Sequence, residues 1–255
     1  IAFMNARAHQ LDMGGITPGG FSGTKANVYE NGLVIGPMKL FEKDKPVRST
    51  FSLVFDNTRF AGFLQPDFMT MAEQLKLGEK LLLESIERYG EQAYRGAVRY
   101  CCDASAEAMG DALERVPDGI YHAEGSIDAD GVDAEEPIVV RASLNKKGRR
   151  LEVDLSGSSR QARTCINAGP LDAKTAVGAA FKLLVDRHTP FTSGAYRHID
   201  IVVPPGTVLS AMPPDGAIML YWEISSVLLS AIVEELGKVL SGDAFAGDYG
   251  TVCVH

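Results

Sequence analysis

The spacing of apolar and polar residues along this chain predicts four helices. From Phe68 to Tyr89, apolar side chains recur every three, four or seven residues, as one face of an amphipathic helix requires. Asp67 follows a break expected at Pro66 and can cap this helix, and Gly90 can end it. Three more helices are expected over residues 91–115, 171–186 and 222–242.

Shorter apolar runs predict strands before and after the first two helices. The N-terminal "IAFMNARAH" is expected to be a strand that leads into the glycine turn, and "GLVIGPMKLFEKDKP" a short strand followed by an exposed loop. "EEPIVVRASL" and "RRLEVDLSG" flank "NKKG", which indicates a hairpin, and "RHIDIVVPPGTVL" indicates a strand ended by two prolines. The predicted fold class is α+β, with mixed strands and long helices.

The order of these elements divides the sequence into three segments. Residues 1–66 are expected to form a strand and loop region, and residues 67–119 a helical segment. Residues 120–255 are expected to form a C-terminal α+β region. The chain begins without methionine, in what looks like a strand already under way, so we expect it to be part of a longer subunit.

Composition and charge narrow the class of protein. With a net charge of −8 and a pI of about 5.2, the chain is a poor candidate for binding nucleic acid or an anionic membrane. No apolar run approaches the ~20 residues of a membrane span. Four cysteines without a C-x-x-C pair predict a reduced, cytoplasmic protein. Cys101 and Cys102 fall in an expected helix with a stripe of alanines, so we expect both to be buried and to take no part in chemistry.

The candidate metal ligands are His9 and Asp12, in the stretch "NARAHQLDMGGITPGG". An imidazole and a carboxylate together suit zinc, manganese or iron. Two side chains do not complete a metal site, so further ligands would have to come from elsewhere. The alternative is a histidine hydrogen-bonded to a carboxylate within a turn. No catalytic residue can be assigned from the sequence.

The glycines that follow Asp12 do not form a known nucleotide site. Their spacing fits neither G-x-G-x-x-G nor G-x-x-x-x-G-K-[ST], and neither pattern occurs elsewhere in the chain. The G-x-S-x-G elbow of serine hydrolases is missing as well. We therefore expect any nucleotide to be held mainly by another protein.

Several ordered blocks resemble the hydantoinase B family, which includes oxoprolinases and the acetone and acetophenone carboxylases. "AHQLDMGGITPGG" and "VYENGLVIGPMKL" are similar to its A-H-x-x-D-x-G-G-x-x-P-G-S and Y-x-E-G-L-x-I-P-P-x-K-L patterns. "ALERVPDGIY", "LEVDLSGSSRQARTCINAG" and "TPFTSGAYRHIDIVVPPGTVL" follow in the family's order. Gly20 departs from the usual serine, and "TRFAG" looks more like the acetone carboxylase large subunit than like the amidohydrolases.

The resemblance implies a catalytic subunit of a hetero-oligomeric, ATP-dependent enzyme. A hydantoinase A-type ATPase partner would bind ATP and magnesium and phosphorylate a small-molecule substrate. The present chain would supply a divalent metal site containing His9 and Asp12. The "TRFAG" stretch favours a ketone carboxylase. The alternatives are an ATP-dependent hydrolase of a cyclic amide, of the N-methylhydantoinase or 5-oxoprolinase type, and a non-catalytic structural subunit of such a complex.

Overall fold

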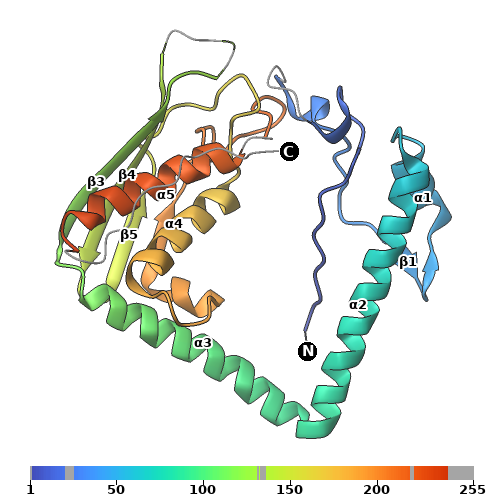
Figure 1. Cartoon of the computed structure of the whole chain (residues 1–255), viewed down its shortest axis with the longest axis horizontal. Helices are drawn as coiled ribbons and strands as arrows, with labels where there is room; N and C mark the ends of the chain where they lie inside the picture. The colour runs from blue at the N-terminus through green and yellow to red at the C-terminus, as the bar shows by residue number, and fades with distance from the viewer. Residues whose placement is uncertain (1, 21–25, 131, 133–135, 219–220, 241–255) are drawn as a thin grey trace. The chain divides into compact units, whose positions relative to one another are not determined.

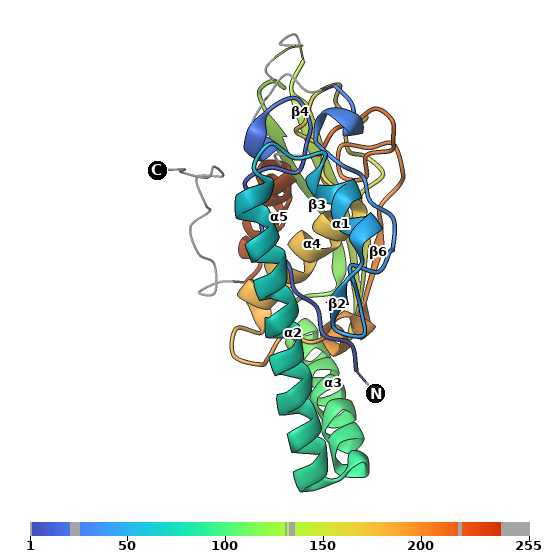
Figure 2. The same ribbon diagram turned by 90° about the vertical axis from the view of Figure 1, so that its right-hand side faces the viewer.

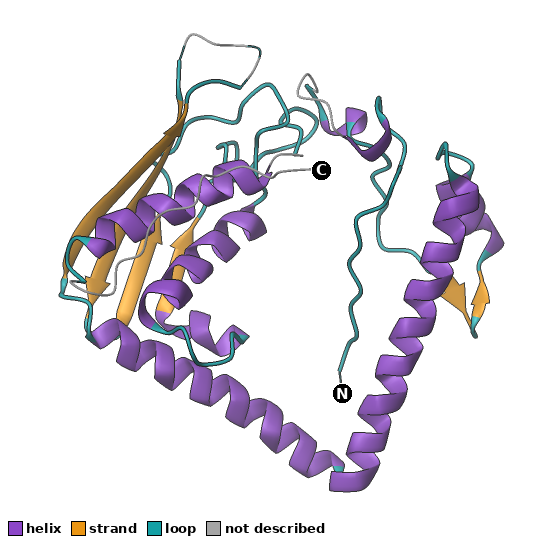
Figure 3. Cartoon of the chain, viewed as in Figure 1, coloured by secondary structure: helices purple, strands orange, loops and turns teal. Residues whose placement is uncertain are grey.

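The structure is a computed structural model, and it describes residues 2–20, 26–130, 132, 136–218 and 221–240 (Figure 1). Helices and strands both occur, and the main sheet is mixed, so the predicted α+β class is confirmed (Figure 3). No helix in these ranges combines the length and the apolar character needed to cross a bilayer.

The chain folds into two compact units. Unit 1 contains residues 1–22 and 29–98, and unit 2 contains residues 23–28 and 99–255. The boundary between residues 98 and 99 lies within one helix. The reason is that this helix buries side chains only in its second half, where it joins the core of unit 2.

Unit 1 is built around one long helix. Helix α1 spans Arg48–Phe55 and α2 spans Ala61–Tyr89, an unbroken rod of 29 residues (Figure 2). Strands β1, Phe41–Glu42, and β2, Lys45–Pro46, form a minimal hairpin. The small core of the unit consists of the following apolar residues of α1 and α2 together with one residue of the N-terminal segment: Met13, Phe51, Val54, Phe55, Ala61, Leu64 and Phe68.

Three predictions for unit 1 are wrong. Helix α2 begins at Ala61 rather than after Pro66, and it contains that proline in its second turn; Leu64, from the turn before Pro66, is fully buried in the core of the unit. "IAFMNARAH" forms no strand in its described residues, and the start of "GLVIGPMKLFEKDKP" forms none either, since the two short strands β1 and β2 lie in its second half, where a loop was expected. Apolar alternation produces a strand only where a partner strand is available, and the described residues offer none at these two places.

Helix α3, Glu91–Glu114, follows directly after Gly90, whose φ of 86° turns the chain out of α2. The expected helix and its break are confirmed. The expected burial of the cysteines is wrong, since Cys101 is exposed and Cys102 only half-buried. The alanine stripe is exposed at Ala93 and Ala97, and full burial begins only at Ser105.

Unit 2 contains a four-stranded sheet in the order β3-β4-β5-β6. The strands are β3, Gly119–Ile127; β4, Ile138–Lys147; β5, Arg150–Asp154; and β6, Ile199–Val202. The first three pair antiparallel and β6 pairs parallel to β5. The predicted hairpin is confirmed as β4–β5, with its turn at Gly148. Strand β3 was not predicted.

Two helices cover one face of this sheet (Figure 1). Helix α4, Pro170–Val185, and helix α5, Tyr221–Gly237, confirm the two expected helices apart from their ends. Alternate strand residues pack beneath them and the intervening ones point to the exposed face. The largest fully buried side chains of this core include Met109, Leu113, Leu144, Leu151, Phe181, Ile224, Leu228 and Ile232.

Candidate functional site

Asp12 lies at the centre of a polar cluster in unit 1. Its side chain is fully buried, whereas that of its partner Arg59 is 40% exposed. Oδ1 of Asp12 accepts from Nη2 of Arg59 at 2.6 Å, and Oδ2 accepts from Nε at 3.0 Å and from the backbone N–H of Arg59 at 2.6 Å. Arg59 therefore forms a bidentate ion pair with Asp12, and its backbone N–H adds a third hydrogen bond. Bidentate hydrogen bonds between two charged groups are among the strong ones in proteins.

The same arginine also holds the glycine turn. Nη2 of Arg59 donates to the carbonyl oxygens of Gly14 at 3.0 Å and Gly15 at 3.2 Å. Arg59 lies between α1 and α2, so the ion pair ties the turn after Asp12 to the start of the long helix. The chain between the two residues supplies most of the unit's small core.

The turn requires glycine for two physical reasons. Gly15 has a φ of 80°, and a Cβ there would lie 2.5 Å from the carbonyl oxygen of Glu30. Gly32 has a φ of 146°, and a Cβ there would lie 2.7 Å from the carbonyl oxygen of Met13. The two segments are also joined by a hydrogen bond from the Leu33 N–H to the Met13 oxygen at 2.8 Å. Glycine at these two positions therefore allows direct backbone contact between the turn after Asp12 and the segment that contains Gly32.

The Asp12–Arg59 ion pair should make the stability of the fold depend on pH in the acidic range. Hydrogen bonds from the Arg59 side chain hold the pKa of Asp12 below its ordinary value of 3.8. A lowered pKa in the folded state contributes stability above the unfolded value and loses it as the pH falls through the folded value. Melting temperatures from pH 6 down to pH 2.5 should therefore fall more steeply in the wild type than in Asp12→Asn. Parallel curves would show that this ion pair adds nothing in solution.

His9 differs from Asp12 in its exposure and in its lack of described partners. Its side chain is exposed, and it makes no described hydrogen bond or ion pair. Within the described residues, no three His, Cys, Asp or Glu side chains are grouped closely enough to hold a metal ion. Both carboxylate oxygens of Asp12 already accept hydrogen bonds from Arg59. A metal at these two residues stays a prediction, and it requires Asp12 to exchange a hydrogen bond from Arg59 for the ion.

A second buried polar residue organises the loops of unit 2. Asn167, in the block "TCINAG", has no exposed surface. Its Nδ2 donates to the carbonyl oxygens of Ala162, Thr164 and Ala217, and its Oδ1 accepts from the Ala162 N–H at 2.7 Å. All four of these bonds go to the backbone, so Asn167 fixes two loops.

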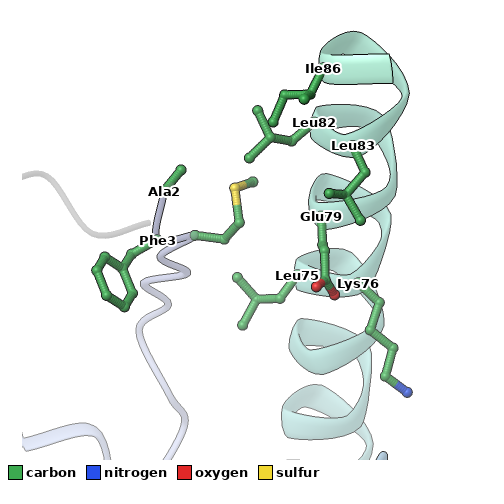
Figure 4. A pocket seen from close by; sticks show the side chains of 9 residues that line it. Ala2, Phe3, Leu75, Lys76, Glu79, Leu82, Leu83 and Ile86 are labelled. Carbon is green, nitrogen blue, oxygen red and sulfur yellow. The ribbon is translucent and has the colours of Figure 1, made fainter. Parts of the chain in front are cut away.

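A hollow on the surface of unit 1 contains neither His9 nor Asp12. It has a volume of about 410 Å³ and lies between residues 2–4 and one side of α2. Leu75 and Leu82 of α2 point toward the N-terminal segment (Figure 4). The lining is mostly apolar, and its charged members are Lys76 and Glu79.

Comparison with known proteins decides the family. The sequence model of the hydantoinase B/oxoprolinase family matches residues 1–255, the whole chain. The chain belongs to the hydantoinase B/oxoprolinase family. The family resemblance inferred from the motif blocks is thereby confirmed. Arg59 was not recognised as part of the site, although it lies in the "TRFAG" stretch that was noted for its resemblance.

Three relatives illustrate the range of similarity. A putative D-/L-hydantoinase subunit of Pseudomonas sp. (strain NS671) is 27% identical, over 97% of this chain. The acetophenone carboxylase delta subunit of Aromatoleum aromaticum is 24% identical, over 94%. The crystal structure of the ATP-dependent caprolactamase from Pseudomonas jessenii superposes with a TM-score of 0.82 at 23% identity, over 91% of this chain. This member of the hydantoinase B/oxoprolinase family spans only 43%, 35% and 40% of these three proteins, respectively.

Proposed function

We propose that the complete protein is a subunit of an ATP-dependent enzyme complex that transforms a small carbonyl compound. The observation that carries this proposal is the match of the hydantoinase B/oxoprolinase family to the whole chain. Relatives named as a hydantoinase subunit, a caprolactamase subunit and an acetophenone carboxylase subunit support it. The chemistry common to these names is reaction at a ketone or amide carbonyl group.

In both candidate reactions a carbonyl oxygen is first phosphorylated by ATP, with release of ADP. In a ketone carboxylase, the ketone loses an α-proton as its oxygen is phosphorylated, which gives an enol phosphate. The phosphoryl group then passes to bicarbonate, the carboxyphosphate breaks down to phosphate and carbon dioxide, and the enolate carbon bonds to that carbon dioxide. In a cyclic amide hydrolase, water adds to the activated carbon and the ring C–N bond breaks to give an amine and an acyl phosphate. A second water then hydrolyses the acyl phosphate to the carboxylate and phosphate. The "TRFAG" stretch at Thr58–Gly62 favours the carboxylase. The hydantoinase and caprolactamase names among the relatives favour the hydrolase.

The proposal includes a second subunit, a hydantoinase A-type ATPase. It rests on the missing phosphate-binding loop, since neither nucleotide-binding glycine pattern occurs in this sequence. It also includes a divalent metal, which when bound would stabilise negative charge developing on the substrate oxygen. Within this chain, Arg59 and Asp12 hold the glycine turn in place, shortly after His9 in the sequence.

One assay tests the proposal and separates its two reactions. The complete protein is combined with the ATPase subunit, and ADP release is measured with a ketone or a cyclic amide, each with and without bicarbonate. We expect ADP release only when both proteins are present, and ketone-dependent release only with bicarbonate. Release that depends on the amide and ignores bicarbonate would identify the hydrolase instead. Full activity without this protein would reduce it to a structural subunit and overturn the proposal.

A further inference from the structure

Three oxygen atoms converge on one nitrogen of Arg59. Nη2 lies 2.6 Å from Oδ1 of Asp12, 3.0 Å from the carbonyl oxygen of Gly14 and 3.2 Å from that of Gly15. This nitrogen carries two hydrogens, so three acceptors share them. The number of oxygens gathered around Nη2 therefore exceeds the number of hydrogens that it can donate.

The two glycines bring their carbonyl groups together. In an extended strand, the carbonyl groups of consecutive residues point to opposite sides, whereas here both accept from the same nitrogen. Gly14 and Gly15 have φ values of 83° and 80°, in a region that residues with a Cβ rarely adopt. The convergence of the two carbonyl groups therefore depends on this pair of glycines.

One carboxylate and two backbone carbonyl oxygens are ligands of the kind that hard divalent cations prefer. Carboxylate, carbonyl and water oxygens suit Mg²⁺, Ca²⁺ and Mn²⁺. The carboxylate of Asp12 is fully buried, and the guanidinium of Arg59 balances its charge. A metal ion on the same oxygens would bring two cations into contact, and like charges repel strongly at such a distance. The guanidinium and the ion therefore exclude each other at these oxygens.

The side chain of Arg59 can leave the three oxygens while Asp12 stays in place. It is 40% exposed, so the guanidinium can move toward water. The backbone N–H of Arg59 donates to Oδ2 of Asp12 at 2.6 Å, and this bond does not depend on where the side chain lies. The carboxylate thus keeps one fixed hydrogen bond when the guanidinium moves away.

We propose that Oδ1 of Asp12 and the carbonyl oxygens of Gly14 and Gly15 form a site for a hard divalent cation such as Mn²⁺, and that Nη2 of Arg59 competes with the ion for these oxygens. Metal uptake then releases the guanidinium, and the guanidinium holds the glycine turn when no ion is bound. The inference rests on the proposed function through its metal, to which it adds two backbone ligands and a competing cation. His9 stays a predicted further ligand, and water would complete the shell.

The test measures the affinity of the complete protein for Mn²⁺ by equilibrium dialysis. Manganese is the probe because thiolates such as that of the exposed Cys101 suit zinc better. We expect Arg59→Gln to lower the dissociation constant roughly tenfold or more, because it removes the competing charge. Arg59→Lys keeps a cation and should bind manganese more weakly than Arg59→Gln. The matched control Arg48→Gln removes an exposed arginine without a described ion pair and should bind as the wild type does.

Melting temperatures with and without Mn²⁺ test the position of the ion. Manganese should raise the melting temperature of Arg59→Gln by more than that of the wild type, because the ion takes over the contacts that Nη2 makes with the turn. Adding Asp12→Asn to Arg59→Gln should abolish this gain and the tighter binding.

The outcomes separate this inference from the proposed function. Equal or weaker binding in Arg59→Gln, with binding still lost in Asp12→Asn, would overturn the competition and leave a metal on Asp12. A protein that binds no manganese with either Arg59 or glutamine at this position would overturn the site itself. Neither result depends on the ATPase subunit, so the measurement of ADP release stays an independent test of the reaction.

Discussion

Arg59→Gln is expected to lower the melting temperature of the complete protein by roughly 5 °C. The change removes both side-chain bonds to Asp12, whose carboxylate is fully buried and cannot be rehydrated without opening the turn. It also removes the bonds to the carbonyl oxygens of Gly14 and Gly15. Arg59→Lys keeps the charge but lacks the planar guanidinium group. Its melting temperature should therefore lie between that of the wild type and that of Arg59→Gln.

The matched control for this prediction is Arg48→Gln. Arg48 is exposed at the start of α1 and makes no described ion pair, so its loss should shift the melting temperature by no more than about 1 °C. Scanning calorimetry or circular dichroism on the three variants is sufficient. If Arg59→Gln has the same melting temperature as Arg48→Gln, the buried ion pair does not contribute to the stability of the protein in solution.

The second large effect concerns bound metal. We expect His9→Ala to lower the metal content of the complete protein without lowering its melting temperature, because His9 is exposed and has no described partner. Asp12→Asn should lower both, since Asp12 is a predicted ligand and also the partner of Arg59. Loss of a direct ligand should weaken metal affinity by about 100-fold or more, at least as much as changes in surrounding residues do.

Metal analysis and melting curves should be run on the same preparations. Arg59→Gln is the informative control, because it disturbs the fold around Asp12 while keeping both predicted ligands. Metal lost in Asp12→Asn but retained in Arg59→Gln would separate ligation from destabilisation. Stoichiometric metal in both His9→Ala and Asp12→Asn would exclude these residues as ligands and leave a purely structural role for Asp12.

The sequence predicted the elements whose signals are local. Helices α4 and α5 and the β4–β5 hairpin carry clear periodicity and turn residues, and they were found close to their expected bounds. Strand β3 was missed because its covered positions are Gly119, Tyr121, Ala123, Gly125 and Ile127, three of them too small to give an apolar alternation. Gly125 is small for a reason that only the structure shows, since a Cβ there would lie 2.7 Å from Cγ1 of Val227 in α5.

Of the two residues in the buried ion pair, only Asp12 could be predicted from the sequence. Asp12 stood out through its neighbours His9 and the glycines, which are adjacent in sequence. Arg59 lies 47 positions further on, and no spacing rule connects the two. A buried carboxylate requires a cation, but the sequence does not indicate which of 25 lysines and arginines supplies it. The fold brings them together through the packing of α1 and α2.

The mixed sheet has a consequence for synthesis of the chain. Strands β3, β4 and β5 are contiguous, but β6 pairs beside β5 only after α4 and its loops have been made, as in the pair Leu151 and Ile199. At roughly 5–20 residues per second, a ribosome needs about 2–10 seconds for the roughly 50 intervening residues. During that interval the free side of β5 is open to other nascent chains. Its exposed residues Arg150, Glu152 and Asp154 are all charged, which discourages such pairing until β6 arrives.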